Sequence, residues 1–171
     1  MVEPLCMSVL AKIHEQIERT DHLIGLLTPE NLDWGPSPLG LNCWPKAKLL
    51  GHPMECLAGF CAVLFAANPE QLPHFSRLRD MRVNHWCEAS EARDRIALYR
   101  AHIDEGFGLL RDTDLTRCLP TVFVSAGEPV LTLLLGNFEH LVNHKHQLFT
   151  YLKLMGAGIA TRDLYQFRNE L

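Results

Sequence analysis

The chain has 171 residues, of which 47% are hydrophobic and 21% are charged, and its formal net charge at pH 7 is −4. This length and composition suit one globular domain with its own core, extending over residues 1–171. The excess of acid, without any run of Lys and Arg, argues against a nucleic-acid partner. The N-terminus is amphipathic rather than a secretory signal, and we find no apolar run near the ~20 residues that span a bilayer. We therefore expect a cytoplasmic protein without a membrane partner.

Hydrophobic periodicity predicts long amphipathic helices with little strand pattern. The expected helices are, in chain order, 4–27, 45–67, 90–111 and 129–155. Thr28 and Pro29 should stop the first helix and begin a further short turn. Ser90 is the expected N-cap of the third helix, and Gly156 the C-terminal stop of the fourth. This pattern predicts an all-α fold, a four-helix bundle.

The connections in this bundle are too long for simple up-down-up-down wiring. Residues 68–87 carry two prolines and weak periodicity, so we expect a long crossover connection there. Residues 112–127 form a second connection, with a short extended piece at 121–124. Inside the second helix, Pro53 removes one backbone hydrogen bond and disfavours helical geometry at His52. We interpret this segment as one kinked helix, the alternative being two short helices that meet there.

Six cysteines are present, but no C-x-x-C pair occurs. A chain of this size has enough apolar residues for a core without disulfides, so we interpret the cysteines as buried, reduced thiols. The alternative is a disulfide or zinc framework. The cysteines are Cys6, Cys43, Cys56, Cys61, Cys87 and Cys118.

The histidines in the last predicted helix point to a metal site. His140 and His144 are four residues apart and therefore lie on one face of the helix, whereas His146 lies on the opposite face. An imidazole on an apolar face needs a partner, and two of them one turn apart can bind one metal ion. The alternative is that these histidines are packing residues with ordinary hydrogen bonds, because such a spacing arises often by chance in a chain with nine histidines. His74 and His85, in the crossover, are expected to face solvent.

Common catalytic signatures such as HExxH, GxSxG, the P-loop and GxGxxG are absent, and so are the Glu-x-x-His pairs of di-iron bundles. The remaining candidate is a mononuclear site in which His52 is the third ligand and Glu55 and Cys56 are reserve ligands. Three imidazoles leave a coordination position open, which is typical of catalytic sites, and they suit zinc, nickel, copper or iron. Asn137 and Glu139 could support the ligands from a second layer.

Two segments of the chain, about 44–60 and 137–156, resemble the DinB-like superfamily of metal-binding four-helix bundles, which includes the bacillithiol transferases. In the first, a tryptophan precedes the sequence LLGH, after a loop of the form WxPxPxG that consists of Trp34, Pro36, Pro38 and Gly40. In the second, the matching residues are His140, His144, Gln147, Leu148, Tyr151, Leu152, Lys153 and Gly156. The chain departs from the family pattern at Pro53 and at His146.

The resemblance implies an up-down-down-up bundle that forms a homodimer and holds nickel or zinc on His52, His140 and His144. It implies a metal-dependent enzyme in which the ion acts as a Lewis acid on a bound thiol or water. We expect a low-molecular-weight thiol S-transferase that uses a thiol and a small-molecule substrate, with Glu55 and Glu139 as candidate acid–base groups. The alternatives are a metal-dependent hydrolase and a non-catalytic, metal-stabilised bundle that works as a sensor or interaction module.

Overall fold

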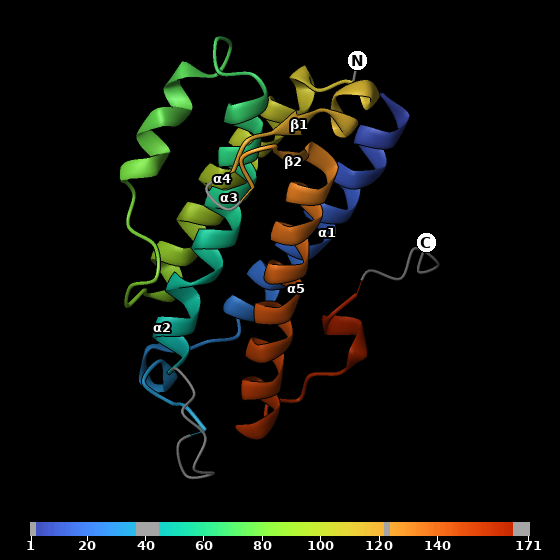
Figure 1. Ribbon diagram of the computed structural model, residues 1–171. Coiled ribbons are helices and arrows are strands. Elements are labelled where there is room, and N and C mark those ends of the chain that lie inside the picture. Colours follow the sequence, from blue (N-terminus) through green and yellow to red (C-terminus); the bar gives the residue numbers. More distant parts are fainter. Residues whose placement is uncertain (1–2, 37–44, 122–123, 166–171) are drawn as a thin grey trace.

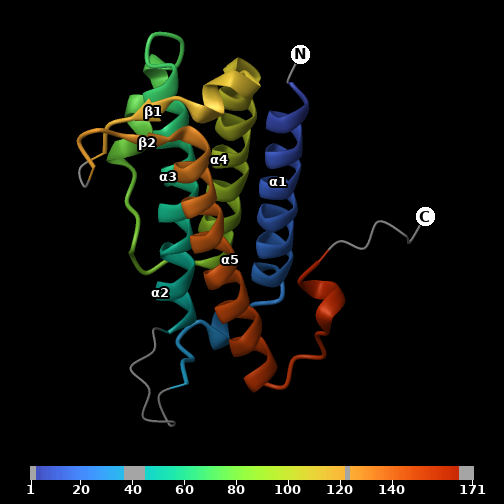
Figure 2. The ribbon, with the colours of Figure 1, turned by 45° about the vertical axis from the view of Figure 1, so that its right-hand side comes forward.

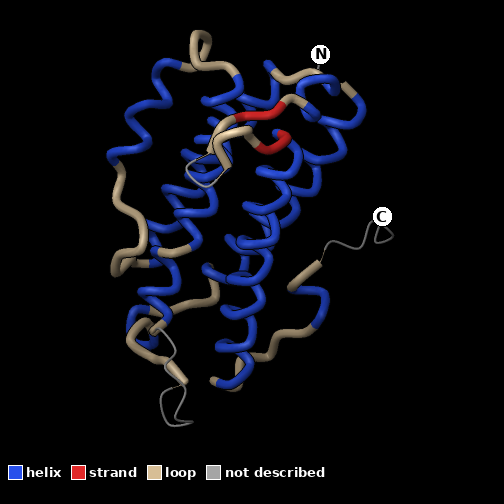
Figure 3. The backbone as a smooth tube through the Cα atoms, in the orientation of Figure 1, coloured by secondary structure: helices blue, strands red, loops and turns tan. Residues whose placement is uncertain are grey.

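The computed structural model describes residues 3–36, 45–121 and 124–165, and these are mostly helical (Figure 1). The α-helices are α1 Pro4–Ile24, α2 Lys46–Gly51, α3 Pro53–Ala67, α4 Ala89–Leu109 and α5 Val130–Leu154. The 3-10 turns are η1 Pro29–Asn31, η3 Pro73–Asp80, η4 Asp112–Thr116 and η5 Thr161–Asp163. Among the described residues, strands occur only in a short antiparallel hairpin of β1 Cys118–Leu119 and β2 Glu128–Pro129 (Figure 3). The predicted all-α class is confirmed.

The long helices form a bundle with an up-down-down-up course. Both α1 and α3 pack against α4 and α5, so α1 and α3 lie diagonally opposite each other. In the two ribbon views, α1 and α5 run in one direction while α3 and α4 run in the other (Figures 1 and 2). Because α3 and α4 are parallel, the chain between them must return along the whole bundle. Residues 68–88, which include η3, provide this predicted crossover.

His52 lies at a one-residue interruption between α2 and α3. Its backbone angles, φ −82° and ψ −42°, are helical. Pro53 has no N–H to donate, and the His52 N–H instead donates to the Leu49 carbonyl at 3.1 Å, the shorter spacing of a 3-10 turn. The ladder resumes where the Glu55 N–H donates to the His52 carbonyl at 2.9 Å. The segment therefore consists of two helices, α2 and α3, joined at His52 with helical backbone angles and a local break in the hydrogen bonds.

The combined segment Lys46–Ala67 has 22 residues and is apolar enough, by length and composition, to cross a membrane. This corrects the expectation that no apolar stretch approaches that length; the interruption at Gly51-His52-Pro53 conceals the run in the sequence. However, 61% of its most apolar window is buried inside the molecule, and α3 packs against both α4 and α5. This is how the core helix of a soluble bundle is placed.

Two local predictions need correction. Helix α4 begins at Ala89, because Glu88 before it is already extended, with φ −74° and ψ 155°; Ser90 therefore lies in the first turn and is not the cap. The paired strands flank the expected extended piece at 121–124 instead of including it. The Thr121 N–H donates to the carbonyl of Val124 at 3.1 Å, which closes a turn, while residues 122–123 lie outside the described part.

The described cysteines are free thiols, as predicted, but the expectation that they are all buried is wrong for Cys118. Cys6, Cys56, Cys61 and Cys87 are buried, and Cys118 is exposed. Cys43, like Pro38, Gly40 and Trp44 of the predicted loop pattern, lies outside the described residues.

Candidate metal centre

The structure brings three histidines together that are far apart along the chain. His52 lies at the α2–α3 junction, and His140 and His144 lie one turn apart on α5, which packs against α3. One ring nitrogen of each lies within 4.8 Å of those of the other two. The ring centroids are 4.9 Å apart for His52 and His140, 4.3 Å for His52 and His144, and 4.7 Å for His140 and His144. All three side chains are partly buried.

Asn84 and Glu55 determine the proton position on His52. The Asn84 amide nitrogen donates to the Glu55 carboxylate at 3.0 Å, so the amide oxygen is the atom that faces Nδ1 of His52. An amide oxygen can only accept, so the His52 Nδ1 must carry the proton and donate it. Nε2 of His52 then holds a lone pair and points toward His140. This is the tautomer that a metal ligand needs, held by a carboxylate–amide pair behind the ring.

Gln147 and Tyr151 do the same for His144. Nδ1 of His144 lies 3.2 Å from Oε1 of Gln147, and the Gln147 amide nitrogen donates to the Tyr151 hydroxyl at 2.9 Å. The Gln147 oxygen therefore accepts a hydrogen bond from the Nδ1–H of His144, which leaves the lone pair of that ring on Nε2. Tyr151 in turn packs edge-on against Trp34, with ring centroids 5.6 Å apart. These contacts explain why Gln147 and Tyr151 accompany the histidines on α5.

The electrostatics keep the α5 histidines neutral. Burial is the main cause that lowers the pKa of His144 to about 4, with smaller contributions from the other two rings. Burial, followed by the nearby His52, also lowers the pKa of His140. Neutral imidazole is the form that coordinates a metal ion, so neither ring has to lose a charge-carrying proton at pH 7 before it can bind one.

The distances fit a metal ion. Nε2 of His52 and Nε2 of His140 face each other at 3.0 Å, with His140 as the donor because the His52 proton is on Nδ1. Two imidazole ligands on a tetrahedral ion, with bonds of roughly 2.0–2.1 Å, have nitrogens about 3.3 Å apart. The observed pair therefore needs to separate by only a few tenths of an ångström, with the His140 proton moved to its outer nitrogen. The three imidazoles and their spacing therefore fit a divalent metal ion of the zinc or nickel type.

The other predicted site residues lie in different places. Glu55 is 3.3 Å from Nδ1 of His52, on the outer side of that ring, and its side chain is 46% exposed, so it can exchange protons with solvent. Glu139 is exposed and is not one of the converging side chains. Asn137 packs against Gly59, where a Cβ would meet Oδ1 of Asn137 at 2.1 Å. Gly59 thus allows the close approach of α3 and α5 that brings the histidines together.

An apolar cavity of about 430 Å³ has Glu55 in its wall, whereas none of the three histidines lines it. Its wall combines one face of α3 with the crossover, and it consists of Glu55, Ala58, Gly59, Cys61, Ala62, Phe65, Phe75, Ser76, Leu78, Arg79, Met81 and Val83. Glu55 is thus shared between the cavity and the surroundings of His52. The volume is within the range of small-molecule sites.

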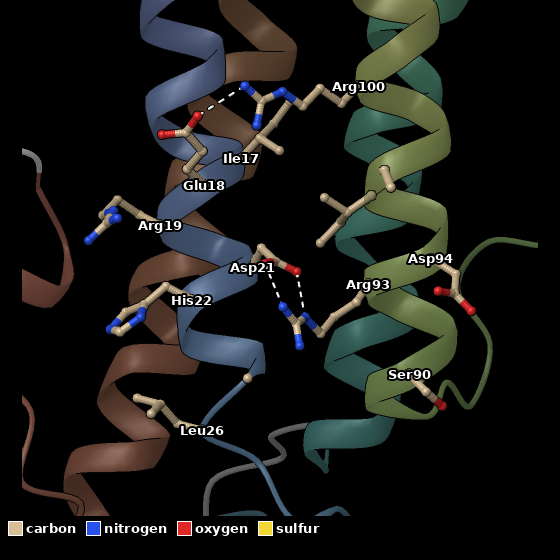
Figure 4. Close-up of a pocket in the computed structure, with 13 residues that line it drawn as sticks. Ile17, Glu18, Arg19, Asp21, His22, Leu26, Ser90, Arg93, Asp94 and Arg100 are labelled. Atoms are coloured by element: carbon tan, nitrogen blue, oxygen red, sulfur yellow. Dashed lines mark hydrogen bonds and ion pairs between the residues drawn. The ribbon is translucent and has the colours of Figure 1, made fainter.

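A larger hollow, about 1010 Å³, lies between α1 and α4, away from the histidines (Figure 4). Four of its charged side chains pair with one another: Arg93 binds Asp21 at 2.8 Å, and Arg100 binds Glu18 at 3.0 Å. These ion pairs are partly exposed on a groove surface, and among the described residues no group of three potential metal ligands lies here. We therefore place the functional site at the smaller cavity beside the histidines.

Sequence reasoning missed two features of the crossover. Asn84 has φ +56°, a left-handed conformation that asparagine tolerates better than most residues, and it contacts His52 from 32 residues away. The sequence signal that could have indicated this turn is an asparagine, Asn84, in a stretch of weak periodicity. His85 was expected to face solvent, but its side chain is only 10% exposed. The reason is its backbone, which packs so closely on Gly51 that a Cβ there would lie 1.9 Å from the His85 carbonyl oxygen.

No protein-family model matches the chain, and no curated protein is similar to it. Among solved structures, a DinB-like protein, YjoA, from Bacillus subtilis is similar, with a TM-score of 0.69 and 16% sequence identity. The similarity covers 93% of this chain and 99% of that one. At this identity the likeness concerns the fold, and it agrees with the bundle that the resemblance implied.

Proposed function

From the DinB-like fold of this chain, we propose that it is a metal-dependent enzyme that transfers a low-molecular-weight thiol to an electrophilic small molecule. The observation that carries the proposal is the convergence of His52, His140 and His144 beside an apolar cavity. A nickel or zinc ion held by these rings would supply a Lewis acid that lowers the pKa of a bound thiol. In the overall reaction a sulfur–carbon bond forms, the bond from carbon to the leaving group breaks, and the thiol proton passes to solvent.

The residues of the chain have distinct tasks in this proposal. Asn84 and Gln147 hold the outer nitrogens of His52 and His144, so that both Nε2 lone pairs stay directed inward. Glu55, half-exposed and 3.3 Å from His52, is positioned to accept the released proton and pass it to water. The cavity walls exclude water from the apolar body of the substrate, which then presents its reactive carbon at the Glu55 end.

The test is a conjugation assay on the full chain. Protein stripped with a chelator and then loaded with nickel or zinc is mixed with a thiol, such as cysteine, and a chloromethyl-aromatic electrophile, and the thioether is measured by mass spectrometry. We expect metal-dependent conjugation that His144→Ala abolishes and His146→Ala retains. A loaded wild-type protein that does not exceed the uncatalysed rate with any thiol tested would refute the proposal.

The same preparations separate the alternatives. Ester hydrolysis that needs the metal but no thiol would identify a metal-dependent hydrolase instead. Metal that raises the thermal stability without supporting either reaction would indicate a non-catalytic bundle. Elemental analysis of protein purified without added metal distinguishes nickel from zinc, and sedimentation of the same sample tests the expected homodimer.

A further inference from the structure

A second cluster of potential metal ligands lies where the crossover enters α4. It consists of His85, Cys87 and Glu91, each of which offers one ligand atom within 4.8 Å of the others. Nε2 of His85 lies 2.7 Å from Oε1 of Glu91. The His85 side chain is only 10% exposed, and Nδ1 of its ring has no hydrogen-bond partner although it is buried. Nε2 is therefore the ring nitrogen that faces Glu91, and it is the atom of His85 that can act as a ligand together with Glu91.

Backbone hydrogen bonds to α2 hold the segment that carries His85 and Cys87 in place. The Cys87 N–H donates to the Ala47 carbonyl at 3.0 Å, and the Asn84 N–H donates to the Gly51 carbonyl at 2.9 Å, so this segment is attached at two points to α2. Cys87 is fully buried. Glu91 has a side chain that is 43% exposed, which gives the cluster an open side toward solvent.

The charges around the cluster permit a cation. Glu91 and Glu88 contribute negative charge near the Cys87 sulfur, and Arg95 is the positive group of this neighbourhood. The Arg95 guanidinium lies 3.9 Å from Glu91 but hydrogen-bonds elsewhere, to the Arg82 carbonyl and to the Tyr99 hydroxyl. Glu91 is therefore only weakly engaged by Arg95 and can turn toward a metal ion.

A nucleophilic role for this cysteine does not fit its surroundings. Burial, followed by the nearby Glu91, raises the pKa of Cys87 to about 12, so the thiol without a metal is protonated and unreactive at pH 7. A buried Cys with a His and a Glu is instead a donor set that zinc takes readily, whereas magnesium and calcium prefer oxygen alone.

We infer that His85, Cys87 and Glu91 form a second site, which binds a zinc-type divalent ion independently of the three-histidine centre. The fourth position is open toward solvent on the Glu91 side. Ligand separations around zinc are roughly 3.2–3.6 Å, so His85 and Glu91 must move apart from 2.7 Å, a movement that the half-exposed Glu91 can make. The site needs no contribution from the proposed transferase chemistry.

Cobalt distinguishes the two sites, because only a thiolate ligand produces a near-ultraviolet sulfur-to-cobalt charge-transfer band. The metal-free full chain is titrated with Co²⁺ while its absorption is recorded. We expect two equivalents per chain, one of which brings the band. Cys87→Ser should lose the band and one equivalent, whereas His144→Ala should lose the other equivalent and keep the band. Uptake of Co²⁺ by the wild type without the band, or a band that persists in Cys87→Ser, would overturn the inference, whereas loss of the equivalent without the band would affect only the three-histidine centre.

Two cysteine variants serve as matched controls. Cys56→Ser tests whether the band comes from a thiol one helical turn from His52, and Cys118→Ser tests the exposed thiol; both should keep the band. If Cys87→Ser does not fold, Glu91→Gln changes a half-exposed ligand while circular dichroism reports the intact fold. It should weaken the band-forming site at least about tenfold, and an unchanged affinity would count against the site.

Discussion

Replacing Gly51 with alanine should damage both the fold and the metal centre. A Cβ on Gly51 would lie 1.9 Å from the carbonyl oxygen of His85 and 2.8 Å from its carbonyl carbon and backbone nitrogen. These are backbone atoms, so the segment 84–87 must move by more than 1 Å to reach ordinary contact distance. Overpacking of this kind costs about 1–3 kcal/mol, and the higher helix propensity of alanine offsets at most about 1 kcal/mol. We expect a net loss of about 1–2 kcal/mol in the free energy of unfolding.

The metal affinity should fall as well, because the displaced segment carries Asn84, which holds the ring of His52. Urea denaturation measures the first effect and calorimetric titration with Zn²⁺ the second. Gly136→Ala is the matched control: Gly136 is also helical, but a Cβ there meets nothing within 4 Å. That variant should be stabilised by about 0.5–1 kcal/mol with unchanged affinity. A Gly51→Ala protein as stable as Gly136→Ala would refute the close packing of the crossover on α2.

Three further predictions concern the histidines. His144→Ala should remove the equivalent of metal bound at the three-histidine centre in elemental analysis, whereas His146→Ala should not, because His146 bonds to the Val142 carbonyl instead; equal loss would contradict the assignment of helix faces. Asn84→Ala should weaken metal binding by about 10–100-fold without abolishing it, and an unaltered affinity in calorimetry would show that His52 needs no support. In metal-free protein, His144 has a pKa of about 4 when folded and about 6.5 when unfolded. Between these values the unfolded state binds more protons, so stability should fall as the pH drops through this window, by at most about 3 kcal/mol in total. Urea denaturation at several pH values measures this slope, and a His144→Ala protein with the same slope would assign it to other groups.

The local parts of the site could be predicted from the sequence. His140 and His144 share a helix face because of the helical repeat alone, and that face was recognisable by its apolar neighbours. The meeting with His52 could be proposed only by resemblance, since it depends on how α3 packs against α5. Gly59 and Asn137 make that packing close, and nothing in either residue alone identifies the other as its partner.

The crossover shows where sequence reasoning is insufficient. Weak periodicity correctly indicated an irregular connection over 68–87, but it gave no reason to place Asn84 on His52 or to bury His85. Both placements follow from the return of the chain to α2, a tertiary contact with no local signal. The prediction of a Ser90 cap is wrong for a smaller reason: the extended N-cap residue is Glu88, two residues earlier, so Ser90 already lies inside the first turn.

The parallel course of α3 and α4 has a consequence for the order in which the molecule assembles. The centre combines His52 with Asn84 from the crossover and with two histidines of α5. Asn84 is 32 positions from His52 along the chain, and the α5 histidines are 88 or more positions away. Contacts of such long range form slowly, because the entropy of closing large loops must be overcome first. Binding of an ion by the three imidazoles should therefore be among the last events of refolding. In a rapid-mixing experiment, the rate of metal binding would report the rate at which α5 finally packs against α3.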